Sequence, residues 1–130
     1  MPDSILGPLP ETMAGNVRVW SLRACKQVII PEGVERIGSR WFWGSDVESV
    51  TISASVKEIG VGAFGKCKNL KEVVFTERSQ LKTIKRSAFN CCDSLANINL
   101  PEGLEKIELG VFCETGLENV EFPASLRTIG

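Results

Sequence analysis

The stretch Val47–Ile59, which reads VESVTISASVKEI, decides the fold because its apolar frame recurs along the chain. In this copy the frame holds Val47, Ile52, Val56 and Ile59 and continues to Phe64. Later copies keep the same order as Leu70, Phe75, Leu81, Ile84 and Phe89, then as Leu95, Leu100, Leu104, Ile107 and Phe112, and in part as Leu117, Phe122, Leu126 and Ile129. An earlier copy holds Ile30, Val34, Ile37 and Phe42. Four copies and a partial fifth, at a period of 22–25 residues, indicate a solenoid.

Each repeat divides into three parts. A first strand such as Leu70–Phe75 ends with apolar residues at the strand period of two. A turn such as Pro31-Glu32-Gly33 then leads into a short second strand, and a compact coil such as Gly60–Cys67 closes the repeat. The chain is two residues longer between Phe75 and Leu81, where we expect a loop. These parts predict a β-rich solenoid with short coils or 3₁₀ turns.

Composition excludes several classes of function. The 130 residues are 43% hydrophobic and 24% charged, with a net charge of −1, so nothing favours a nucleic-acid backbone as partner. No apolar run approaches the roughly 20 residues of a membrane helix, and the start of the chain does not resemble a signal peptide. Histidine is absent, and the five cysteines form no CxxC pair. We therefore expect no cofactor, no metal site and no insertion into a membrane.

Residues 1–27 precede the repeat and contain prolines that would break an early helix. We interpret them as an N-terminal cap, because the first coil of a solenoid would otherwise expose its interior to water. Trp20 is a plausible lid in this segment. The repeats themselves are expected to occupy residues 28–130.

Four stretches carry a resemblance to a known family: IPEGVERIG at 30–38, VKEIGVGAFGKCKNLKEVVF at 56–75, LKTIKRSAFNCCDSLANINLPEGLEKI at 81–107 and FPASLRTIG at 122–130. They resemble the BspA-like leucine-rich repeat. The resemblance implies a right-handed parallel β solenoid, often on cell-surface or secreted proteins that bind host proteins, matrix or other cells. It supplies no catalytic residue. The sequence departs from the family pattern where Ser45 and Thr115 replace the usual cysteine and where Trp41 replaces alanine.

The first strands should form a sheet whose outward residues lie in rows. One row is Ile29, Thr51, Val74, Asn99 and Glu121, and the other is Ser49, Glu72, Asn97 and Asn119. Sheets of repeat proteins commonly present such a surface to a partner, although a merely solvated face is the alternative. From these rows we take Thr51, Glu72, Val74, Asn97, Asn99 and Glu121 as candidate partner-binding residues.

Trp43 is a further candidate for partner binding. Its alignment with Gly65 and Asn90 predicts that it faces outward on the convex side, and an exposed tryptophan beside Arg40 is typical of a binding hot spot. The alternative is that Trp43 packs against the N-terminal cap.

The cysteines give little support for chemistry. Cys67 and Cys92 occupy the same place in adjacent copies and should stack as small buried hydrophobes, although a redox pair, a metal pair or a disulfide between the coils is possible on spacing alone. Cys91 and Cys113 should lie nearer solvent. Thiol catalysis requires an activating base or cation, and no histidine is available to cycle a proton.

The sequence stops before the coil that would complete the last repeat, which predicts uncovered apolar residues there. We expect a longer parent chain or self-association through this end. The leading interpretation is a non-catalytic module for protein binding or adhesion that uses the sheet face. The alternatives are a structural spacer or assembly element and, third, an enzyme that uses a cysteine.

Overall fold

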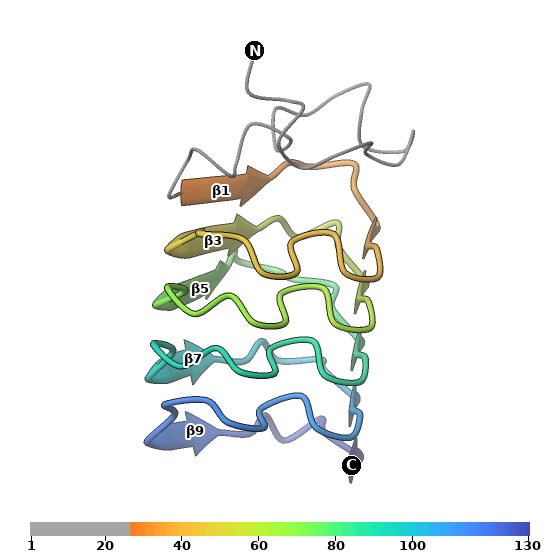
Figure 1. The fold of residues 1–130 in the computed structure, drawn as a ribbon. Coiled ribbons are helices and arrows are strands. Elements are labelled where there is room, and N and C mark those ends of the chain that lie inside the picture. Colours follow the sequence, from red (N-terminus) through yellow and green to blue (C-terminus); the bar gives the residue numbers. More distant parts are fainter. Residues whose placement is uncertain (1–26) are drawn as a thin grey trace.

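The computed structural model describes residues 27–130, which form a solenoid of stacked coils (Figure 1). Each coil contributes a first strand and a two-residue second strand, and all paired strands are parallel. The first strands are β1 (Gln27–Ile30), β3 (Ser49–Ile52), β5 (Glu72–Phe75), β7 (Asn97–Asn99) and β9 (Asn119–Glu121). The second strands are β2 (Arg36–Ile37), β4 (Glu58–Ile59), β6 (Thr83–Ile84), β8 (Lys106–Ile107) and β10 (Thr128–Ile129). The predicted β solenoid is confirmed, and the expected N-terminal cap lies almost wholly outside the described residues.

The second strands form one continuous sheet in the order β10-β8-β6-β4-β2. Its register places one isoleucine of each coil directly against the isoleucine of the next: Ile37, Ile59, Ile84, Ile107 and Ile129. The four from Ile37 to Ile107 are buried. A coil of this size cannot hide its own apolar side chains, so this column exists only because neighbouring coils stack in register.

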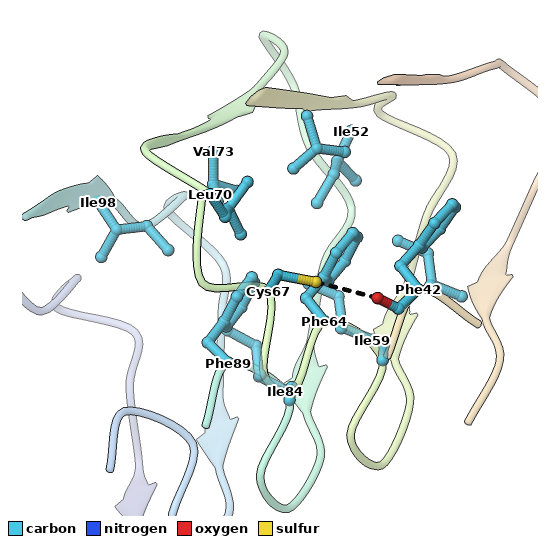
Figure 2. Close-up of a cluster of buried hydrophobic side chains, with 14 of the residues drawn as sticks. Phe42, Ile52, Ile59, Phe64, Cys67, Leu70, Val73, Ile84, Phe89 and Ile98 are labelled. Atoms are coloured by element: carbon cyan, nitrogen blue, oxygen red, sulfur yellow. Dashed lines mark hydrogen bonds between the residues drawn. The ribbon is translucent and has the colours of Figure 1, made fainter. Parts of the chain in front are cut away.

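A column of aromatic rings fills the interior beside the isoleucines. Phe42, Phe64, Phe89 and Phe112 stack almost parallel, with centroid distances of 5.1, 5.4 and 6.1 Å between successive rings. Figure 2 shows three of these rings beside the Ile59 and Ile84 side chains. Spacings of this kind suit offset stacking, and each fully buried ring stabilises the fold by about 1.5–3 kcal/mol.

The third part of each coil consists of successive turns, and the described residues contain no helix. Two places in each coil adopt a left-handed backbone conformation, and they align from coil to coil as Arg40, Gly62, Ser87 and Gly110, and as Gly44, Lys66, Cys91 and Glu114. A residue with positive φ cannot continue a right-handed helix. These left-handed residues explain why the third part of each described repeat forms successive turns and contains no 3₁₀ helix.

The first strands form two sheets where one was expected. β1, β3 and β5 form one sheet, β7 and β9 form the other, and no strand ladder joins β5 to β7. The two extra residues of the chain lie in the turn directly after β5, and a hollow of about 260 Å³ separates this turn from the one that follows β7. The break between β5 and β7 thus lies beside the longer turn. We call the break between β5 and β7 the seam.

Two serines hydrogen-bond the proline-glycine turns of the repeat to the following coil. Ser55 accepts a hydrogen bond from the Gly33 N–H (3.0 Å) and donates one to the Val34 carbonyl (2.8 Å). Ser125 makes the same pair of bonds with Gly103 and Leu104, at 2.9 and 2.8 Å. The backbone groups of these turns are therefore satisfied by the next coil.

Candidate functional site

The outward rows of the first strands are aligned within each of the two sheets but not across the seam. The register aligns Ile29, Thr51 and Val74 on one side of the seam and Asn99 with Glu121 on the other. Alternate residues such as Val50 and Ile52 point inward and are buried, so the residues between them face outward. Ile29 is 68% exposed and Val74 is 39% exposed. We call this surface the first-strand face.

The seam places four of the seven candidate residues around one depression. A hollow of about 300 Å³ lies between β5 and β7 and is lined by Glu72, Val74, Asn97 and Asn99, among others. Thr51 and Glu121 lie on the neighbouring strands β3 and β9. The first-strand face therefore has a recess at its centre, which the sequence did not predict.

The buried hydroxyl of Thr76 lies at the end of the seam. Thr76 directly follows β5, and its Oγ1 is buried without a hydrogen-bond partner among the described residues. Ser53 follows β3 at the equivalent place and donates to the Pro31 carbonyl at 2.9 Å. Hydrogen bonding of buried polar groups is therefore less complete at this end of the seam than at the equivalent place of the coil before it.

Trp43 is half-buried and lies across the coil that follows its own. A Cβ at Gly65 would overlap the indole, and one at Gly62 would lie 3.1 Å from it, so two glycines form the seat of this side chain. The Arg40 guanidinium lies 5.0 Å from the ring centroid and the Lys66 ammonium 5.9 Å from it. Trp43 is thus held by cation–π contacts and by glycine backbone, away from the first-strand face. Both glycines are visible in the sequence, but only the stacking of coils shows that they lie beneath Trp43.

The stacked cysteines are structural. The Cys67 thiol donates to the Phe42 carbonyl (2.9 Å), as Figure 2 shows, and the Cys92 thiol donates to the Phe64 carbonyl (3.1 Å). Both are free thiols, and burial raises the pKa of each. A buried, protonated thiol is a poor nucleophile. In this chain these cysteines bridge coils by S–H···O bonds, and no disulfide joins them.

Cys91 and Cys113 lie nearer solvent, as predicted. Cys91 is half-buried and Cys113 is exposed, and both are free. The Cys91 thiol lies 3.0 Å from the side-chain oxygen of Asn90. Within residues 27–130 no group of three or more Cys, Asp or Glu side chains is arranged to hold a metal ion. In the same part of the chain no helix is long and apolar enough to cross a bilayer.

The architecture is that of a leucine-rich-repeat solenoid. Its strands are parallel, its coils contain 22–25 residues, and isoleucine and phenylalanine side chains stack in columns inside it. Residues 19–130 match the family model described as the BspA type leucine rich repeat region, in six copies. The chain belongs to this family. No protein with a curated description is significantly similar to it.

Solved structures with the same fold come from several bacteria. A leucine-rich repeat protein of T. pallidum is 31% identical, with a TM-score of 0.75 over 81% of this chain. One from Bacteroides capillosus is 30% identical, with a TM-score of 0.67 over 75% of this chain and 76% of its own length. One from Bacteroides ovatus is also 30% identical, with a TM-score of 0.59 over 81% of this chain and 33% of its own. This chain spans about half the length of the T. pallidum protein, of which 51% is covered.

Proposed function

We propose that this chain is a non-catalytic module that binds a protein partner through the first-strand face. The observation that carries the proposal is the recess at the seam, around which Glu72, Val74, Asn97 and Asn99 converge from two strands. A recess lined by amide and carboxylate groups with one exposed valine offers hydrogen bonds and some apolar burial to a protuberance of the partner. Membership of a family of repeat proteins that are generally non-catalytic supports the same proposal.

The proposal extends to the setting in which the module acts. The resemblance to BspA-like repeats implies cell-surface or secreted proteins, and we propose adhesion to a protein of another cell or of a matrix. Trp43, with Arg40 and Lys66 on its ring, would supply a secondary contact. Its side chain already has extensive contacts within the solenoid, so the face is proposed to contribute most of the binding.

Charge reversal on the face tests the proposal. The intact chain would be used to capture proteins from an extract of cells or matrix, and the captured protein would then be titrated by calorimetry. Glu72→Lys with Glu121→Lys should weaken binding at least about tenfold. The matched control is Asp46→Lys with Asp93→Lys, the same charge change on the exposed coils, which should bind as the wild type does. Equal binding by both double variants would contradict a role for the face.

A second candidate function is a spacer or assembly element that associates through its last coil. In the chain as given, β9 and β10 each have a strand on one side only, and Phe122 and Ile129 are 48% and 56% exposed. Exposed apolar side chains at an open strand edge favour association. Light scattering over a range of concentrations would show a dimer that Phe122→Ser abolishes; a monomer at all concentrations would exclude this assembly.

The third candidate, an enzyme that uses a cysteine, has less physical support because two of the described thiols are buried with raised pKa values. Alkylation near neutral pH is the test. Rapid labelling of one cysteine, at a rate far above that of a free thiol, would revive the candidate.

A further inference from the structure

The coils carry a groove on the side opposite the first-strand face. Trp41 lies beside this groove and differs in residue type from the equivalent residues of the later coils. The equivalent residues of the next two coils are Ala63 and Ala88, both buried. An indole cannot fit in the space of a methyl group, and Trp41 lies instead over Gly38, where any Cβ would overlap it. The bare backbone of Gly38 therefore admits the ring, and Trp41 forms one wall of a hollow over the second strands.

The hollow has the size of a ligand site. Its volume is about 770 Å³, within the roughly 300–1,000 Å³ of small-molecule sites, and it extends across β2, β4 and β6. The second strands lie on the opposite edge of the coils from the labelled first strands in Figure 1. The groove is therefore separate from the recess at the seam.

Three cationic residues, Arg36, Lys57 and Lys82, and two acidic ones, Glu35 and Glu58, line the groove, so its lining has a net charge of +1. Arg36 is paired with Glu58 at 3.5 Å, and both line the groove. Lys82 forms an ion pair with Glu105 of the following coil, with 3.8 Å between its Nζ and a carboxylate oxygen. Lys57 lies level with Lys82 on the adjacent coil and makes no ion pair with any described residue. Lys57 therefore lies between Glu35 of the preceding coil and Lys82 of the following one. The two adjacent lysines repel each other, and an anion bound between them would relieve that repulsion.

The rest of the lining indicates which kind of anion fits. Apart from Trp41 and the buried Val34, the groove offers charged groups, a threonine hydroxyl and glycine backbone, and it has no apolar pocket for the side-chain anchor of a peptide. A pyranose ring has an apolar C–H face that suits an aromatic plane and hydroxyls that suit charged, hydrogen-bonding side chains.

We propose that this groove binds an anionic oligosaccharide that carries carboxylate groups. Trp41 contacts the C–H face of one sugar ring, and Lys57 and Lys82 bind a carboxylate of the chain. The Arg36–Glu58 pair donates and accepts hydrogen bonds with the hydroxyls. This activity is independent of protein binding at the first-strand face, so either can fail without the other.

Calorimetry with two matched hexasaccharides tests the proposal. Hyaluronan hexasaccharide alternates N-acetylglucosamine with a uronic acid, whereas chitohexaose contains only N-acetylglucosamine and has no charge. The intact chain should bind the hyaluronan hexasaccharide at least about tenfold more tightly than chitohexaose at low salt, and added sodium chloride should weaken this binding.

Variants locate the site. Trp41→Ala should weaken hyaluronan binding about tenfold, and it should fold because alanine is the residue at this place in the next two coils. Lys57→Gln should also weaken it, whereas the controls Leu109→Ala and Lys68→Gln, at exposed residues outside the groove, should leave it unchanged. Absence of binding up to millimolar hyaluronan hexasaccharide would overturn the proposal. So would equal binding of chitohexaose, tighter binding of a hexaglutamate peptide, or losses no larger in the groove variants than in the controls.

Discussion

The two sides of this solenoid are built from the same coils but differ in continuity and in charge. The second strands form an unbroken sheet of five strands, and its neighbouring coils are linked by the ion pairs Arg36–Glu58 and Lys82–Glu105. The first strands are divided at the seam, and most residues of their outward rows are uncharged. Both sides contain a step of 25 residues, from Ile59 to Ile84 and from Phe75 to Leu100. The second strands keep their ladder across this step, whereas the first strands lose it.

A repeat protein of this kind can vary in its surface turns without losing its fold. The isoleucine and phenylalanine columns fix the stacking of the coils from Ile37 and Phe42 onward. The insertion after β5 lies at the surface beside the recess, and the interior columns stay in register across it. We therefore expect stability to depend mainly on the continuous side and binding mainly on the divided one.

The largest expected effect on stability is the difference between two isoleucine-to-alanine variants, one from each side of the solenoid. Ile59 belongs to β4 of the continuous sheet and is fully buried, whereas Ile98 belongs to β7 at the seam and lines its hollow. Ile59→Ala should lower the free energy of unfolding by about 3–5 kcal/mol, and Ile98→Ala by about 2 kcal/mol, because the space at the seam can collapse. Urea denaturation of both variants measures the difference, and an equal or larger loss for Ile98→Ala would refute the distinction.

A smaller effect, of opposite sign at two equivalent places, should distinguish the seam from the coil before it. Thr76→Val removes a buried hydroxyl without a partner and should raise the free energy of unfolding by about 1 kcal/mol. Ser53→Ala removes a hydroxyl that donates to the Pro31 carbonyl and should lower it by about 1 kcal/mol. If Thr76→Val is destabilising in urea denaturation, the Thr76 hydroxyl has a partner in solution.

The smallest expected effect concerns acid stability on the continuous side. Desolvation alone would raise the pKa of the Glu108 carboxyl, but the hydrogen bond from the Arg86 N–H (3.0 Å) and the charges of Lys85 and Lys106 outweigh it, so the pKa is lowered. A carboxyl whose pKa is lower in the folded protein stabilises it above the unfolded value, about 4.3, and this contribution is lost as the pH falls through the folded value.

Denaturation midpoints at pH 7 and pH 3 measure this contribution. Glu108→Gln should lower the midpoint at pH 7 and change it less at pH 3, because a larger fraction of the wild-type carboxyl is protonated at the lower pH. Glu118→Gln, at an exposed glutamate, serves as the control. An effect of Glu108→Gln that is the same at both pH values would show that its charge does not contribute.

Most of the architecture follows from the sequence because a solenoid repeats one local rule. The spacing of Ile37, Ile59 and Ile84 is sufficient to predict the column they form, and the outward rows follow from the alternation within each strand. The same alignment also predicts that Cys91 and Cys113 lie nearer solvent than Cys67 and Cys92. The candidate residues of the first-strand face remain predictions, although the structure places them on one surface.

Features that depend on two coils at once could not be predicted. The sequence shows two extra residues after Phe75, but whether an insertion bulges outward or separates two strands depends on packing against the next coil. The seat of Trp43 on Gly62 and Gly65 likewise requires the register of side chains on neighbouring coils. Trp41 was visible as a departure from alanine, yet the groove beside it appears only when Gly38 and the second strands are placed in space.

Native-state hydrogen exchange, followed residue by residue by NMR, tests most directly the claim that the coils are continuous on one side and divided on the other. The amides of β5 that face β3 and the amides of β4, β6 and β8 should exchange slowly. The amides of β7 that face β5 should exchange rapidly, because no ladder is present there to protect them. Equally slow exchange of the β7 amides would contradict the seam and, with it, the recess proposed to bind the partner.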